Sequence, residues 1–133
     1  MGGKHYADYL ASPLERFRLG LFGLVVDDAF DSCPYLVGSA LKKASYRDVD
    51  VRVILLDDDF EQRFGPATDW RSNRALRASN LAFSALGLQM TGLPIDFQAE
   101  QMTAANNEND GPRNALGIDL RYAIPADERG SDA

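Results

Sequence analysis

The sequence predicts a two-layer fold of helices and strands, of the α/β or α+β class. Apolar residues over 12–31 recur at the spacing of a helix, whereas those over 48–56 form a run typical of a buried strand. Helix-type and strand-type segments then alternate along the chain, and a last strand-type segment, 116–124, lies near its end. Chains with this alternation build sheets that helices cover.

The length and composition predict one domain, residues 1–133, with a core over about 12–102 and a loop and added strand or arm over 103–133. The hydrophobic fraction of 45% is typical of a protein with a packed core. No apolar run reaches the roughly 18 residues that a membrane span needs, so no membrane partner is expected. Because the first residues lack an apolar signal core, the sequence predicts a cytoplasmic protein.

The composition also excludes several classes of site. A single cysteine, Cys33, cannot form an internal disulfide and fits a reducing compartment. With His5 as its one histidine, the chain has no zinc site of the usual composition and no well-placed base for a Ser-His-Asp triad. The net charge of −6 argues against broad, sequence-independent binding of nucleic acid, which depends on neutralising phosphates.

The first helix starts with a complete set of capping residues. Ser12 can cap the first turn, Pro13 suits the first helical position, and Glu15 can complete a capping box. Gly20 and Gly23 each weaken a helix by about 1 kcal/mol relative to alanine. We therefore expect these two glycines at a place where another part of the chain packs closely.

A short strand, Tyr35–Val37, leads into the turn Gly38-Ser39 and a helix over 40–45. Ser39 stands where a helix N-cap belongs, and a glycine lets a ligand approach the backbone. Together they predict a turn whose N–H groups can hold phosphates. The alternative is an ordinary strand-to-helix turn, and Lys42 either faces the phosphates or the solvent.

Two aspartates, Asp48 and Asp50, open the next strand and point to the same face, because side chains alternate along a strand. Two like charges side by side are unfavourable unless a cation relieves them. The pair therefore suggests a metal site. Arg52 lies on the same face and either pairs with a carboxylate or reaches a phosphate, and Asp57–Asp59 are expected in a solvated loop.

A second long helix is expected over about 70–86, with Thr68 or Asp69 as its cap. Arginines recur every three residues along one side of it: Arg71, Arg74 and Arg77. This row is interpreted either as a solvated basic face or as a contact to a phosphate or an acceptor.

The third strand, Ile95–Ala99, alternates apolar residues with Asp96 and Gln98, which share one face. Residues 103–112 are polar, contain turn formers and are expected to be a long loop. The segment 116–124 alternates like a half-buried strand, and we interpret it as an added edge strand or as an arm that pairs with a second subunit in a homodimer.

The sequence Val37-Gly38-Ser39 followed by Asp48-Val49-Asp50-Val51 resembles the signature of the polymerase beta-like nucleotidyltransferase superfamily, and most closely that of its minimal nucleotidyltransferases. The resemblance covers about residues 12–102. It implies a mixed sheet with helices mainly on one face. It also implies an enzyme that transfers a nucleoside monophosphate from a nucleoside triphosphate, such as ATP, to an acceptor hydroxyl, with two divalent metal ions.

By this resemblance Asp48, Asp50 and Asp96 are the catalytic and metal-binding residues, and the expected ion is Mg²⁺ or Mn²⁺, since the ligands are oxygens. Four further residues are expected to bind the nucleotide: Gly38, Ser39, Lys42 and Arg74. The acceptor is a nucleic acid, a protein or a small molecule. Two alternatives stay open: a catalytically silent nucleotide- or metal-binding module, and an antitoxin-type nucleotidyltransferase that modifies a partner protein.

Overall fold

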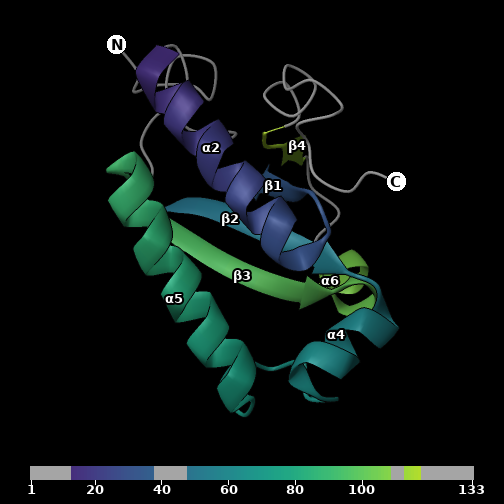
Figure 1. Cartoon of the computed structure of the whole chain (residues 1–133). Coiled ribbons are helices and arrows are strands. Elements are labelled where there is room, and N and C mark those ends of the chain that lie inside the picture. The colour runs from purple at the N-terminus through teal and green to yellow at the C-terminus, as the bar shows by residue number, and fades with distance from the viewer. Residues whose placement is uncertain (1–12, 38–47, 109–112, 118–133) are drawn as a thin grey trace.

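The computed structural model describes residues 13–37, 48–108 and 113–117 (Figure 1). In chain order the elements are α2 (Pro13–Phe30), β1 (Pro34–Val37), β2 (Val49–Leu55), α4 (Asp57–Phe64), α5 (Arg74–Thr91), β3 (Ile95–Gln101), α6 (Met102–Glu108) and β4 (Asn114–Ala115). The predicted mixture of helices and strands is confirmed at the level of the α+β class.

The strands form one mixed sheet in the order β3-β2-β1-β4. β1 runs antiparallel to both β2 and β4, whereas β2 and β3 are parallel. Parallel neighbours need a long crossover connection, which α4 and α5 supply here. The register aligns Val37 of β1 with Asp50 of β2, and Asp50 with Asp96 of β3.

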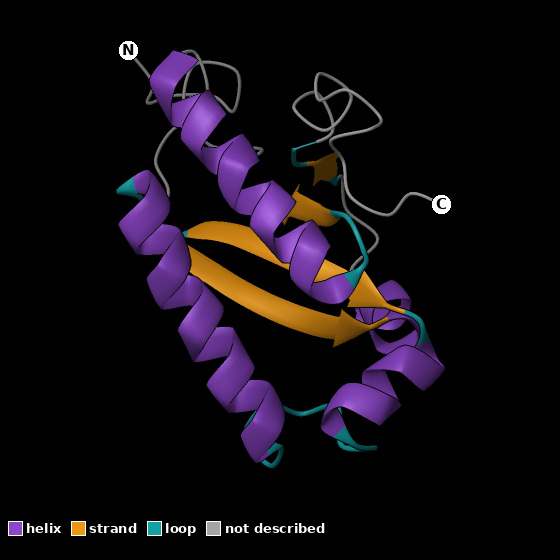
Figure 2. Ribbon diagram, viewed as in Figure 1, coloured by secondary structure: helices purple, strands orange, loops and turns teal. Residues whose placement is uncertain are grey.

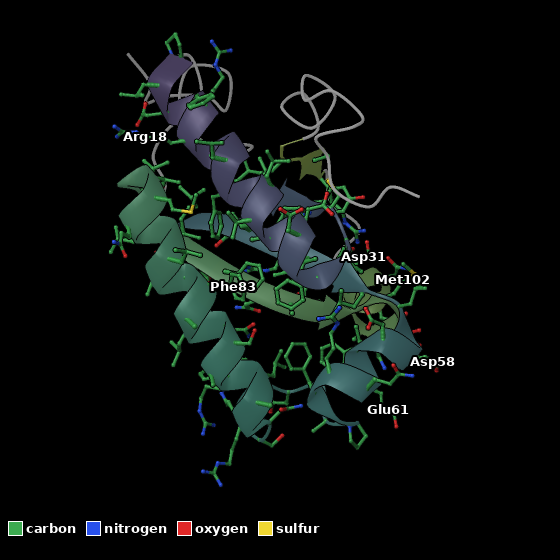
Figure 3. All side chains as sticks on the ribbon, viewed as in Figure 1. Arg18, Asp31, Asp58, Glu61, Phe83 and Met102 are labelled. Atoms are coloured by element: carbon green, nitrogen blue, oxygen red, sulfur yellow. The ribbon has the colours of Figure 1, made fainter. Side chains whose placement is uncertain are left out.

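The two long helices, α2 and α5, lie together over one face of the sheet (Figure 2). The side chains beneath them are fully buried and include Val51, Val53 and Phe97. The Phe97 ring lies 6.4 Å from the ring of Phe22 and 5.2 Å from that of Phe83, measured between centroids. Figure 3 shows Phe83 reaching from α5 towards the sheet. These aromatic contacts join both helices to the edge strand β3.

Polar side chains of α5 bind the outer edge of β3. Ser84 Oγ accepts a hydrogen bond from the backbone N–H of Phe97 at 2.9 Å, and Asn80 Oδ1 accepts one from that of Ala99 at 3.0 Å. These N–H groups face away from β2 and would otherwise need solvent. The helix therefore supplies the partners that a further strand would have given.

Close packing explains Gly23, as expected. A Cβ atom at this position would lie 2.8 Å from the Cβ atom of Leu116, which follows β4. Gly117 has φ of +81° and lies against the backbone of α2, where a Cβ atom would be 3.0 Å from the Gly20 oxygen. The glycines let the residues that follow β4 approach α2.

The expected solvated loop at Asp57–Asp59 is wrong, because these residues form the first turn of α4. Three carboxylates there favour a helix, since they lie beside the partial positive charge of its N-terminus. Asp59 also pairs with Arg63 one turn later, at 3.0 Å between Oδ1 and Nε. Asp58 and Glu61 do point into solvent (Figure 3).

The expected loop over 103–112 is also wrong in its first half, where α6 forms. The Asp57 carboxylate accepts hydrogen bonds from both the backbone N–H and the hydroxyl of Thr103. A residue 46 positions away thus caps this helix, and the local sequence carries no sign of it.

The start of α5 differs from the prediction. The helix begins at Arg74, and its cap is Asn73 rather than Thr68 or Asp69. The Asn73 side chain accepts a hydrogen bond from the N–H of Leu76 and donates to two carbonyls of the preceding loop. This cap is buried and has all its hydrogen bonds satisfied, which explains why it sets the helix start.

A short strand, β4, pairs with β1 at the edge of the sheet, but it ends before Leu116, so the expected strand start at Leu116 is wrong. The part of the strand prediction over 118–124, and the helix over 40–45, lie outside the described residues. In the described ranges, no helix combines the length and the apolar character that crossing a membrane requires.

Candidate metal centre

The sheet brings together the three aspartates expected as metal ligands. Asp50 and Asp96 face each other across the parallel pair β2 and β3. Asp48 directly precedes β2, where the N–H of Val49 binds the carbonyl of Pro94 and fixes the start of both strands. One carboxylate oxygen from each aspartate lies within 4.8 Å of the others.

The donor set and spacing fit a divalent cation. All three groups offer carboxylate oxygens, which suit hard ions such as Mg²⁺, Mn²⁺ or Ca²⁺. Two ligands of one Mg²⁺ are at most about 4.2 Å apart, twice a metal–oxygen distance of about 2.1 Å. The three oxygens, within 4.8 Å of one another, would therefore have to move closer together to bind one such ion.

Arg52 is the cation that the structure places beside these carboxylates. Its guanidinium lies 3.9 Å from Asp50, 3.7 Å from Asp96 and 3.8 Å from Glu100, between nitrogen and carboxylate oxygen. Its shorter bonds are to backbone, with Nη1 at 2.7 Å from the Asp96 carbonyl and 3.1 Å from that of Val51. Of the two interpretations of Arg52, the geometry supports pairing with carboxylates.

Burial raises the pKa of Asp50 above its ordinary value of 3.8. The Arg52 guanidinium opposes this rise, while the nearby carboxylates of Asp96 and Asp48 add to it. The positive charge of one arginine is thus too small to offset burial and two acidic neighbours. An additional cation would stabilise the ionised form of Asp50.

The face that carries these aspartates continues as a polar row. Gln98 lies beside Arg52 in the register, and Glu100 lies beside Ile54. In the other direction the row from Asp96 through Asp50 reaches Val37, the last described residue before Gly38. Gly38, Ser39 and Lys42 themselves lie outside the described residues, as does any contact they make.

Two adjoining hollows lie beyond Asp96, on the far side from β1. The larger, of about 390 Å³, is bounded by the loop at 68–71, the N-terminal half of α5, the end of β3 and α6. The smaller, of about 120 Å³, is lined by Asp96 and Arg77 among others. Both share Trp70, Asn80 and Gln98.

The expected row of three arginines is not one helix face. Arg71 precedes α5, is 73% exposed and lies over the Trp70 ring, with 5.1 Å from its Cζ atom to the ring centroid. Arg74 is exposed at the start of the helix. It is Arg77, and not Arg74, that lines a hollow together with Asp96.

Sequence reasoning did not single out Asn80 or the position of Trp70 at the hollows. Asn80 follows Leu76 by one helical turn, so a polar residue recurs on the buried face of α5. That periodicity was the available signal.

In comparisons with known proteins, no family model, no curated protein and no solved structure matched the chain.

Proposed function

We propose that the chain is a metal-dependent nucleotidyltransferase of the polymerase beta-like fold. The observation that carries the proposal is the convergence of Asp48, Asp50 and Asp96 from two adjacent strands, with oxygens within 4.8 Å of one another. The mixed sheet, with both long helices over one face, supports the same family. The phosphate-binding role of Gly38-Ser39 in this proposal comes from the sequence resemblance alone.

In this proposal Asp48 and Asp50 would hold both ions, and Asp96 would complete the site nearer the acceptor. The ions would supply positive charge that neutralises the triphosphate and favours ionisation of the attacking hydroxyl. The acceptor oxygen forms a bond to the α-phosphorus, the bond from that phosphorus to the pyrophosphate oxygen breaks, and the hydroxyl proton passes to water. Atoms and charge balance without an oxidant or reductant.

The residues around the aspartates are suited to hold them in place. The backbone carbonyls of Asp96 and Val51 anchor Arg52, so the guanidinium stays on this face without a short bond to any carboxylate. Since the carboxylate oxygens keep acceptor capacity, they remain able to bind ions. Arg52 thereby limits the repulsion in the metal-free protein.

The test compares the parent with Asp50→Asn, and with Asp58→Asn as a control on the exposed surface of α4. Thermal melts are recorded with chelator and with excess Mg²⁺ or Mn²⁺, because an ion that binds only the folded state raises the melting temperature. We expect the ions to stabilise the parent and the control but not Asp50→Asn.

Activity is measured with each labelled nucleoside triphosphate, Mn²⁺ and candidate acceptors. Transfer should occur with the parent and the control and fall at least about a hundredfold with Asp50→Asn, as for loss of a group that acts in the transition state. A parent that shows neither ion-dependent stabilisation nor transfer would overturn the proposed function.

A further inference from the structure

Both hollows along β3 are lined by a buried amide group whose N–H donors make no hydrogen bond among the described residues. Asn80 is 9% exposed and lines both hollows. Because its partner at Ala99 is an N–H donor, the atom that binds it must be Oδ1, which leaves the Nδ2 amide group. No hydrogen bond of the described residues uses that Nδ2 group. A buried donor left without a partner costs about 1–3 kcal/mol, so a water molecule or a polar ligand atom that displaces it is the expected partner.

Two flat groups stand next to this amide. Trp70 is 41% exposed and lines both hollows, with Arg71 over its ring. Gln98 is half-buried on β3, and its side-chain amide bonds to none of the described residues. An indole ring and amide groups are the combination with which proteins bind nucleobases, by stacking and by hydrogen bonds to the base edge.

Arginine side chains at this place can contact a phosphate group. Arg77 lines the smaller hollow, and Arg74 with Arg77 borders an open surface recess on the outer side of α5. The acidic groups of the larger hollow have cationic neighbours, since Asp69 lies 3.6 Å from Arg71 and Glu100 lies 3.8 Å from Arg52. A phosphate attached to the base would reach Arg77.

The position relative to the aspartates assigns a role. Asp96 lines the smaller hollow from the edge strand β3, and Asp50 lies beside it on β2. In the proposed function Asp96 is the metal ligand nearer the acceptor. A ligand in the smaller hollow is therefore on the side of the attacking hydroxyl.

We infer that the hollows lined by Trp70, Asn80, Gln98 and Arg77 bind a nucleoside phosphate that serves as the acceptor. The role of acceptor rests on the proposed function, whereas the binding itself does not require metal. The base lies at Trp70 and accepts a hydrogen bond from Asn80, the phosphate faces Arg77, and a sugar hydroxyl points to Asp96. A free nucleotide and the terminal nucleotide of a nucleic acid share this chemistry.

The experiment measures binding by calorimetry in the presence of chelator, so that the aspartates hold no ion. The probes are the nucleoside monophosphates, a short single-stranded oligonucleotide and ribose 5-phosphate, which lacks the base. The chain contains one tryptophan, so a change in its fluorescence on binding reports on Trp70 alone. We expect saturable binding of at least one nucleotide or of the oligonucleotide with a fluorescence change, and at least tenfold weaker binding of ribose 5-phosphate.

The variants separate the parts of the site. Asn80→Asp keeps the acceptor for the Ala99 N–H and removes the donor, and it should weaken binding at least tenfold, as should Arg77→Gln. Gln98→Leu serves if Asn80→Asp fails to fold by circular dichroism. Gln62→Ala, on exposed α4 away from both hollows, is the control and should bind like the parent.

Asp50→Asn distinguishes this inference from the proposed function. If both hold, Asp50→Asn binds the nucleotide in chelator as tightly as the parent but transfers nothing. Binding without any metal-dependent transfer by the parent would overturn the function alone. The inference is overturned if no probe binds the parent, if ribose 5-phosphate binds equally well, or if folded variants at Asn80, Gln98 and Arg77 bind like the parent.

Discussion

Alternate residues of β2 and β3 form the two faces of the sheet, and the two faces differ in what surrounds their side chains. On the face under α2 and α5, Val51 and Phe97 are fully buried among apolar side chains. On the other face, Asp50 and Asp96 share one arginine at distances of 3.9 and 3.7 Å. The apolar face is closed by packing, whereas the polar face retains capacity to bind. The packed core and the candidate metal centre thus lie on opposite sides of the same strands, and substitutions at neighbouring residues can separate their effects.

The largest expected difference is between Phe97 and Gln98, adjacent residues that point to opposite faces. Phe97→Ala should lower the free energy of unfolding by about 3–5 kcal/mol, because it removes a ring that contacts both helices and leaves a cavity. Gln98→Ala should change it by less than about 0.5 kcal/mol, because its side-chain amide bonds to none of the described residues. Urea unfolding of both variants measures the contrast. Similar losses for the two would show that the faces do not differ in this way.

Arg52 tests whether charge balance on the polar face also stabilises the fold. Arg52→Met keeps the length of the stem but removes the guanidinium from three carboxylates and two carbonyls, and it should cost about 1.5–3 kcal/mol in chelator. Added Mn²⁺ should restore part of that loss by replacing the missing charge. Arg71→Met, at a pair that is mostly exposed, should cost less than about 0.5 kcal/mol. If Arg52→Met and Arg71→Met lowered the free energy of unfolding equally, Arg52 would not stabilise the fold through charge balance.

Gly23 tests how tightly the apolar side is closed. Gly23→Ala gains helix propensity of about 1 kcal/mol, but its Cβ atom would lie 2.8 Å from the Cβ atom of Leu116. Overpacking of this kind costs about 1–3 kcal/mol, so a net destabilisation of about 1 kcal/mol is expected by thermal unfolding. Gln89→Ala, at an exposed position of α5, gives the size of a substitution without a clash. A variant more stable than the parent would mean that Leu116 gives way easily.

The smallest effect is a pH dependence of opposite sign at two aspartates. The pKa of Asp50 is raised by burial, so the folded state binds the proton more tightly than the unfolded state. Its contribution to stability is present below the ordinary value of 3.8 and is lost as the pH rises through the raised pKa. The pKa of Asp57 is lowered by its bonds to Thr103, so its contribution is present above 3.8 and lost as the pH falls through the lowered pKa.

These signs are checked by unfolding in chelator across the acid range. Asp50→Asn should remove a decline in stability with rising pH, while Asp57→Asn should remove a gain. An excess of Mn²⁺ should reverse the parent's decline at Asp50, because only the ionised carboxylate binds the ion. The same slope in the parent and in both variants would contradict the assignment.

Local patterns predicted the elements with strong periodicity. The alternation around Asp48 and Asp50 indicated β2 and the face that carries both carboxylates, and the capping residues from Pro13 indicated α2. Register is different, because it depends on partners distant in sequence. The pairing of Asp50 with Asp96 was expected only through the family resemblance, and the contact from Val49 to Pro94 that fixes it is tertiary.

Two of the missed features have the same physical origin. α6 depends on the carboxylate of Asp57 in another helix, and no residue near Thr103 indicates that cap. The periodicity of α5 places Asn80 on its buried face, but only the distant edge of β3 gives its side-chain oxygen a hydrogen-bond partner. Roles that a residue acquires from a distant backbone group cannot be read from local spacing.

The hydrogen bonds from β3 to Ser84 and Asn80 also bear on how copies of the chain can associate. An outermost strand with unsatisfied N–H groups invites a strand from another molecule, which is a route to unwanted aggregation. Here α5 occupies two of those donors, at Phe97 and Ala99. Growth of the sheet at β3 is therefore hindered, and among the described strands the other edge that could pair with a second copy is β4.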